Sequence, residues 1–415
     1  MNAVDFAAAR NLKRLKYVVC LRNARAEGDG IARHYIGLEN VEPWTGKLVQ
    51  PAANISENSL AMEGESTSST FEVGDVLFGK LRPYLAKVWV AEFPGRSTTE
   101  LLVMQPRDVD APFLRYVLLN RTFIDAVDAS TFGSKMPRAD WDFIGNMPIP
   151  VPGLHVQRRI ARFLDRQTAS IDALVCAKQR QLDLISEKRK AMIAAAVTRG
   201  LDPGAPMRDS GVPWLGAVPA HWQIERARWL FRERDVRSET GEEEMLTVSH
   251  LTGVTPRSEK DVNMFEAETN EGYKVCLPGD LVINTLWAWM GAMGVAPMKG
   301  IVSPAYNVYE AGPRLESSYV DLLVRLPVFA REVTRYSKGV WSSRLRLYPE
   351  GFFETCLPVP PLEEQRAVVV HIAREIAKLN GFRDATGRTI ELLKERRSAL
   401  IAAAVTGQID IGAAA

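Results

Sequence analysis

The chain has 415 residues, 46% of them hydrophobic and 25% charged, which is enough to bury sizeable cores in two or more domains. Its 52 Lys and Arg residues nearly balance its 50 Asp and Glu residues, so a polyanion would have to be met by local basic patches or with another subunit's help. The four cysteines stand singly, which argues against a disulfide framework and a metal site. The N-terminus lacks a signal peptide's apolar core and no window approaches a membrane span, so we expect a cytoplasmic protein.

Residues 1–152 are predicted to form a first α/β domain. The stretches "FEVGDVLFGKLRPYLAKVWVAEF" and "STTELLVMQP" are typical of strands separated by Gly turns, and a helical "FLRYVLLNRTFIDAV" follows them. The proline-rich "MPIPVPGLHVQ" then marks the junction with a helix, because proline is tolerated before a helix and in its first turn.

A long helix is expected over residues 153–200. Its apolar residues recur at spacings of three, four, seven or eight and make a narrow stripe, which needs a second helix to cover it. The residues on this stripe are Ile160, Leu164, Ile171, Leu174, Leu182, Ile185 and Met192. Residues 201–222, rich in Pro and Gly, are predicted to be a linker that docks through Trp214 and Trp222.

The second half repeats this order. A second α/β domain is predicted over residues 223–360, and a second long helix with a C-terminal tail over residues 361–415. Gly381 and Gly387 favour a kink or break inside that helix, since each glycine costs about 1 kcal/mol relative to alanine. The apolar stripe of the second helix consists of Val368, Ile372, Leu379, Phe382, Ile390, Leu393 and Leu400.

The two helices are near-copies at an offset of 208 residues. "EKRKAMIAAAVTRGLD" at 187–202 returns as "ERRSALIAAAVTGQID" at 395–410, and Pro150, Pro152, Leu154 and Gln157 return as Pro358, Pro360, Leu362 and Gln365. Two matching stripes are most simply explained by an antiparallel coiled coil between them. The predicted fold is therefore α+β, with two α/β domains, two long helices and an internal pseudo-twofold repeat. The alternative is that each helix packs separately on its own domain or on another protein.

The order of motifs resembles the DNA-specificity subunit of type I restriction-modification systems over essentially the whole chain. The motifs are "GDVLFGKLRPYLAK", "PIPVPGLHVQRRIARFLD", "AAAVTRGLD", "DSGVPWLGAVPAHW", "GIVSPAYNVY", "PVPPLEEQRAVVVHI" and "AAAVTGQID". The resemblance implies two target recognition domains that each read half of an asymmetric, two-part DNA site. It also implies paired helices that act as a spacer and dock two methyltransferase (modification) subunits, which work with restriction/translocase subunits.

The same resemblance implies a chain without catalysis of its own, with S-adenosylmethionine, ATP and Mg expected on the partner subunits. No phosphate loop, Gly-rich cofactor loop or zinc-protease motif is found in the sequence. Three other hypotheses stay open: a coiled-coil adaptor for protein partners, a self-sufficient nuclease or methyltransferase, and the specificity subunit of a related bipartite system that cleaves near its site.

Basic residues in loops of both halves are the candidate DNA contacts, because Arg and Lys bind phosphates and read base edges. An ordinary solvated basic loop is the alternative for each. Trp287, Trp289 and Met290 could stack on bases, but we predict that they belong to a buried strand core. The first half lacks the "WLGAVPAHW" segment, so we expect the tail after Val405 to pack there. The candidates are Lys80, Arg82, Lys87, Lys135 and Arg138 in the first half, and Lys338, Arg344 and Arg346 in the second.

Overall fold

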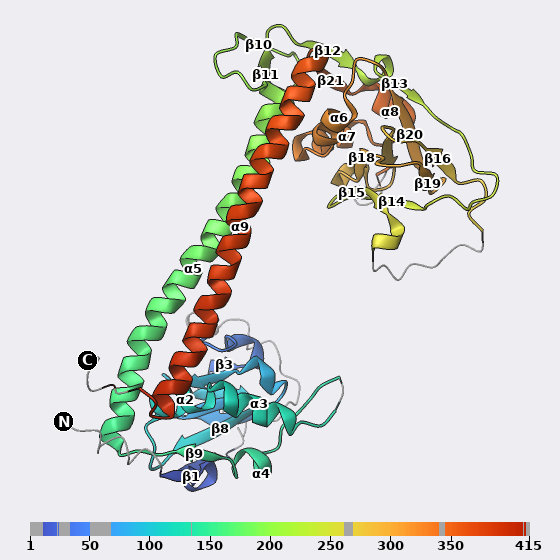
Figure 1. Ribbon diagram of the computed structural model, residues 1–415. Coiled ribbons are helices and arrows are strands. Elements are labelled where there is room, and N and C mark those ends of the chain that lie inside the picture. The colour runs from blue at the N-terminus through green and yellow to red at the C-terminus, as the bar shows by residue number, and fades with distance from the viewer. Residues whose placement is uncertain are drawn as a thin grey trace. The chain divides into compact units, whose positions relative to one another are not determined.

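The computed structural model describes residues 11–22, 24, 34–49, 68–133, 135–260, 269–339, 345–409 and 411. They belong to two compact units, one formed by Met1–Arg180 with Gly387–Ala415 and the other by Gln181–Thr386. Each unit contains one mixed α/β domain and one part of each long helix (Figure 1). No described helix is long and apolar enough to cross a lipid bilayer.

The domain of the first unit is built on a four-stranded antiparallel sheet with the order β2-β8-β5-β6. A second, three-stranded sheet has the order β3-β7-β4, and short strand β1 pairs with β9. The strands are β1 (Leu12–Arg14), β2 (Val19–Leu21), β3 (His34–Ile36), β4 (Ser68–Phe71), β5 (Val76–Gly79), β6 (Val88–Val90), β7 (Gly95–Thr98), β8 (Leu101–Pro106) and β9 (Pro148–Pro150), and the helices are α2 (Ala111–Leu118), α3 (Arg121–Ala129) and α4 (Trp141–Ile144).

Strand β5 shows why this sequence folds into two layers. Its residues alternate between two cores: Val76 and Phe78 pack with the helices, while Leu77 packs on the opposite side with residues of the three-stranded sheet. A strand covered on both faces is apolar throughout, as the fully buried sequence "VLFG" is.

The domain of the second unit repeats the four-stranded sheet with the order β13-β20-β17-β18. Strand pairs β10-β11, β12-β21, β14-β15 and β16-β19 complete it. The strands are β10 (Met207–Asp209), β11 (Ala217–Pro219), β12 (Gln223–Arg226), β13 (Phe231–Glu233), β14 (Leu246–Ser249), β15 (Gly253–Pro256), β16 (Lys274–Cys276), β17 (Leu281–Asn284), β18 (Met293–Val295), β19 (Gly300–Val302), β20 (Tyr306–Ala311) and β21 (Cys356–Val359), and the helices are α6 (Ser317–Val324), α7 (Pro327–Tyr336) and α8 (Pro349–Glu354).

Each domain contains an ion pair with a buried aspartate, at equivalent positions, that sequence reasoning missed. Asp75 precedes β5 and accepts from the Arg22 guanidinium at 2.7 Å; Asp280 precedes β17 and accepts from Arg234 at 2.8 Å. Each aspartate also accepts a backbone N–H three residues earlier in the chain, at 2.8 Å in both cases. The signal was the Gly-Asp dipeptide that both halves place before this strand.

The long helices are α5 (Leu154–Arg199) and α9 (Leu362–Val405), which run antiparallel and lie side by side (Figure 1). In the first unit the start of α5 and the end of α9 share a core, in which Leu164 and Ile401 are buried. In the second unit the end of α5 and the start of α9 do the same, with Val197 and Val368 buried. Helix α9 continues through Gly381 and Gly387, so the expected break is absent.

Side-chain amides at equivalent positions fasten each helix to its domain. Gln157 of α5 accepts from Asp110 N at 2.7 Å and donates to Pro152 O at 2.7 Å. Gln365 of α9 accepts from Glu316 N at 2.8 Å and donates to Arg314 O and Pro360 O. Both glutamines are buried, which makes these bonds expensive to lose.

Different segments close the two domains, as the sequence predicted. In the second unit Trp222 is buried, its indole N–H donating to Glu364, and Trp214 packs edge-on against Phe329. In the first unit the C-terminal tail covers the domain core instead. Ile411 is buried in that core and Ile409 packs against it.

Candidate DNA interface

The first unit gathers its basic candidates around the turn that follows β5. The backbone of this turn is joined to the loop before α4 by hydrogen bonds from Ala139 N to Lys80 O at 2.9 Å and from Arg82 N to Pro137 O at 2.8 Å. Two stretches about 55 residues apart therefore bring Lys80, Arg82, Lys135 and Arg138 to one place. Arg82, Lys135 and Arg138 are exposed, and Lys80 is half-buried.

Two of the basic side chains around this turn are engaged within the domain. Arg138 makes a two-pronged ion pair with Glu100, at 2.7 and 3.1 Å, so part of its charge is compensated. Lys87 donates from Nζ to the carbonyl oxygen of Leu38, and its partial burial lowers the pKa of the amine. Lys87 is thus placed to stabilise the fold of the domain rather than to bind a ligand.

The second unit presents a corresponding loop before α8. Lys338 and Arg346 exchange two backbone hydrogen bonds of 2.9 Å, and both side chains are exposed. The guanidinium of Arg346 also lies over the ring of Tyr348, 6.0 Å from its centre. In the first unit Phe132 and Arg138 exchange the same two bonds, at 3.2 and 3.1 Å. Arg138 and Arg346 therefore occupy equivalent places. Arg344 lies outside the described residues.

The turn that follows β5 in the first unit and β17 in the second carries different side chains in the two units. Leu347 N donates to Thr285 O at 3.0 Å, just as Ala139 N donates to Lys80 O, so Thr285 and Trp287 stand where Lys80 and Arg82 do. The expectation of a buried core fails here: Trp287 is 50% and Met290 36% exposed, because the strand ends at Asn284 and the chain turns outward.

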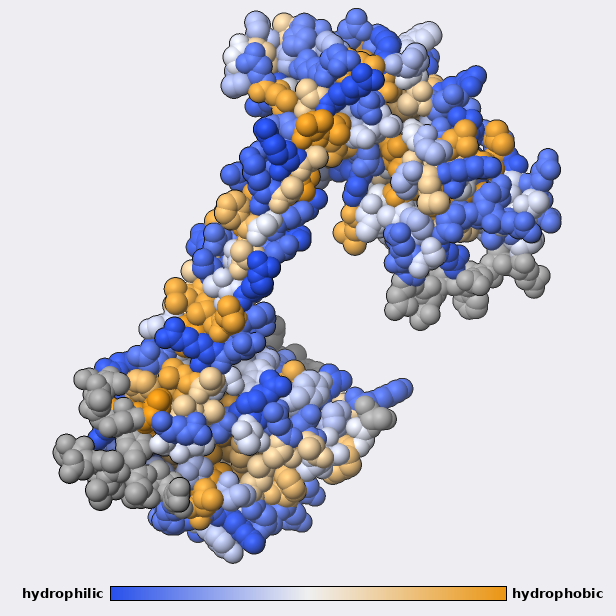
Figure 2. All heavy atoms as spheres, in the orientation of Figure 1, coloured by the Kyte–Doolittle hydropathy of each residue, from blue (hydrophilic) through white to orange (hydrophobic). Residues whose placement is uncertain are grey.

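The predicted coiled-coil residues fall into three groups. Ile160, Leu164, Ile171, Val368 and Ile372 are buried, and Ile185, Met192, Leu379, Leu393 and Leu400 are half-buried. Leu174 and Phe382 depart from the prediction, since they are 52% and 64% exposed. They stand at equivalent positions in the two helices, as do the exposed Leu184 and Leu392. Figure 2 shows apolar side chains on the outer surface of the helices.

The described part of the chain contains no group of three or more His, Cys, Asp or Glu side chains that could hold a metal ion. The cysteines are free thiols, and burial raises the pKa of the Cys276 thiol to about 11, which keeps it protonated and unreactive.

Fold and site together define a class of protein: two homologous α/β domains with a divergent exposed turn, carried on two long antiparallel helices. No family model matches the sequence. The chain is 25% identical over 162 residues to the type I restriction enzyme EcoDI specificity subunit of Escherichia coli, a match covering 39% of this chain and 35% of that protein. It is 20% identical over 403 residues to the MjaVIII specificity subunit of Methanocaldococcus jannaschii, covering 92% and 84%.

Solved structures agree in fold. The HsdS subunit from Thermoanaerobacter tengcongensis matches with a TM-score of 0.55 at 18% identity, over 96% of this chain and 97% of that one. A chain from a study of complex assembly and conformational transition of the type I R-M system matches with a TM-score of 0.67 at 19% identity, over 96% and 98%. In sequence and in fold the chain is thus similar to specificity subunits of type I restriction-modification systems.

Proposed function

We propose that this chain reads an asymmetric, two-part DNA target, one half with each domain, and brings partner methyltransferase and restriction subunits to it. The observation that carries the proposal is a shared scaffold with divergent side chains. The same strand, turn and loop recur in both domains, joined by equivalent bonds from Ala139 N to Lys80 O and from Leu347 N to Thr285 O, while Arg82 in one domain is Trp287 in the other. Two different recognition surfaces require two different half-sites.

Positions shared by the two domains and positions that differ between them suggest two kinds of DNA contact. Arg138 and Arg346 stand at equivalent places, and a contact kept in both domains suits the phosphate backbone, which is the same in every sequence. Side chains that differ between the domains suit base edges, which differ between half-sites. Lys80, Arg82 and Lys135 are proposed as further contacts of the first domain, and Lys338 and Arg344 of the second.

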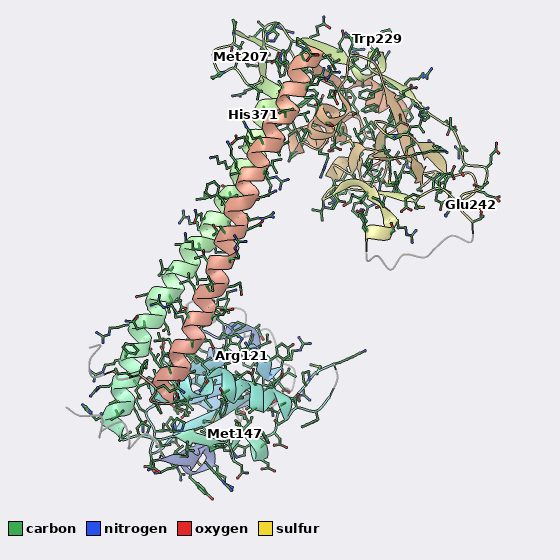
Figure 3. The ribbon with its side chains drawn as sticks, in the orientation of Figure 1. Arg121, Met147, Met207, Trp229, Glu242 and His371 are labelled. Carbon is green, nitrogen blue, oxygen red and sulfur yellow. The ribbon has the colours of Figure 1, made fainter. Side chains whose placement is uncertain are left out.

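Shared exposed apolar residues support docking of two identical methyltransferase subunits. Leu174 and Phe382 form one equivalent pair on the helices, and Leu184 and Leu392 form another. On the domains, Tyr17 and Trp229 are equivalent and strongly exposed (Trp229 is labelled in Figure 3). Large apolar side chains exposed at the same place in two diverged halves fit one partner bound twice.

We assign the chemistry to the partners. In this proposal the methyltransferase subunits hold S-adenosylmethionine and the restriction subunits use ATP and Mg, while this chain is non-catalytic and acts in the cytoplasm on the host's own DNA. The specificity subunits matched above support the assignment.

The proposal is tested by mapping methylated adenines across the host genome, with the gene intact and with residues 223–357 exchanged for the same segment of a relative. We expect an asymmetric two-part motif, of which the exchange changes one half alone. If no methylation motif depends on the gene, the chain is not a specificity subunit, and an adaptor for protein partners becomes the better explanation.

A further inference from the structure

The turn after β17 carries a stacked pair of tryptophans at the surface. Trp287 is half exposed, and its indole lies nearly parallel to that of Trp289, with 15° between the planes and 6.4 Å between ring centres. Leu286 and Met290 beside them are also exposed. Large apolar side chains clustered on a surface commonly mark a place where another molecule binds.

Hydrogen bonds hold this turn in one conformation. Trp287 N donates to Asn284 O at 3.1 Å, and Trp287 O accepts from both Met290 N and Ala292 N at 3.0 and 3.1 Å. The indole N–H of Trp289 donates to Leu286 O at 3.0 Å, which fixes its ring. Both indole rings therefore present their apolar faces from a prearranged backbone, so little conformational entropy is lost on binding.

Comparison with the first unit indicates that the surface around Trp287 belongs to the candidate DNA interface. In its corresponding turn, which runs from Lys80 to Ala86, the place of Trp287 is taken by Arg82 and that of Trp289 by Tyr84. Both turns are bonded to the basic loop of their own domain, through Lys80 O in one unit and Thr285 O in the other. A charged guanidinium with five N–H donors and a largely apolar indole at one position of one scaffold favour different chemical groups.

We propose that Trp287, positioned beside Trp289, reads the second half-site by apolar contact with the 5-methyl group of a thymine. Thymine carries the apolar group of the major groove, and hydrophobic side chains are its usual partners, whereas Arg82 is suited to hydrogen bonds with guanine. This inference rests on the proposed function and names the kind of base contact that separates the two domains.

The experiment uses the complex of this chain with its methyltransferase subunits and a synthetic duplex that carries the genomic motif. Each thymine of the second half-site is replaced by uracil, which removes the methyl group and leaves the hydrogen-bonding pattern unchanged. We expect one replacement to lower kcat/KM for methylation about tenfold with the wild-type complex. With the Trp287→Ala complex the same replacement has no further effect, because the contact is already lost.

Arg82→Ala is the matched control, since it changes the same position of the other domain. It should weaken discrimination in the first half-site and leave the uracil effect in the second at its wild-type size. Trp287→Phe keeps an apolar ring and should retain most of the uracil effect, which separates a lost contact from a misfolded domain.

Three results would overturn the inference. One is a second half-site without any thymine, and another is a Trp287→Ala complex that still responds to uracil. The third is a variant that assembles poorly with the methyltransferase subunits but keeps its motif, which would make the aromatic pair a protein-docking site. All three results are compatible with the proposed function. A wild-type complex that methylates no two-part motif would contradict the proposed function itself.

Discussion

Buried side-chain amides link each long helix to the domain beside it. Gln157 and Gln365 each bond a backbone N–H before a domain helix and a carbonyl of the proline-rich junction. A glutamine can serve both because its amide has an acceptor and a donor end. Tyr319 makes a similar link: its buried hydroxyl donates to Val197 O at the end of α5, and burial raises the pKa of that hydroxyl well above its usual value.

Replacing Gln365 with leucine should therefore destabilise the second unit. The substitution keeps the bulk but leaves Glu316 N and Arg314 O without their partner, at a cost of about 1 to 3 kcal/mol in the free energy of unfolding. Urea denaturation of the purified chain measures the change. Gln179→Leu, at an exposed site on α5, is the matched control and should shift the midpoint little. Equal effects at both sites would mean that the buried bonds contribute nothing.

Segments of different sequence cover the cores of the two domains. The C-terminal tail closes the first domain as the segment around Trp214 and Trp222 closes the second. Ile409 and Ile411 of the tail therefore belong to the domain built from the N-terminal half of the chain. Such an arrangement makes the first domain depend on a segment nearly 400 residues away in sequence.

Ile411→Ser should loosen the first unit selectively. A buried isoleucine contributes about 2 to 5 kcal/mol relative to a small residue, and a position near the chain end should give the lower part of that range. Hydrogen exchange read peptide by peptide should show faster exchange in residues 101–129 and unchanged exchange in residues 306–336. Leu201→Ser, at a partly exposed position of the linker, serves as control. Faster exchange in both domains would contradict a local role for the tail.

At the scale of the whole molecule, each unit's α/β domain adjoins one end of the same two long helices. Helices of 46 and 44 residues are about 65 to 70 Å long, which exceeds one turn of DNA, about 34 Å. In the proposed function this length sets the number of base pairs between the half-sites. The half-sites themselves are set by the domains, so spacing and sequence should be separable.

Inserting seven residues after Arg180 and seven more after Thr386 should lengthen the spacer alone. Seven residues make nearly two helical turns, so the apolar stripe keeps its face while each helix grows by about 10 Å. The methylated motif should then gain up to about three base pairs between unchanged half-sites. Insertion into only one helix is the control and should abolish methylation by putting the stripes out of register. An unchanged spacer after the double insertion would show that the helices do not measure the distance.

Much of this could be read from the sequence because repetition was visible in it. The 208-residue offset predicted two helices and their equivalence, and the missing "WLGAVPAHW" segment predicted the role of the tail. Burial was less predictable. Leu174 and Phe382 satisfy the apolar spacing yet lie exposed, since spacing identifies a face without saying where along a helix that face is covered. Trp287 was misjudged because its surroundings are apolar and the end of the strand is not marked in sequence.

By itself, the sequence determined the duplicated architecture, the two long helices and the family resemblance, because these depend on local periodicity and on repeated motifs within one chain. Only the tertiary structure decided which side chains share a surface. Lys80 and Arg138, or Thr285 and Arg346, are brought together by backbone hydrogen bonds between segments about 60 residues apart. Such bonds form between peptide groups that every residue carries, so side-chain identities do not reveal them.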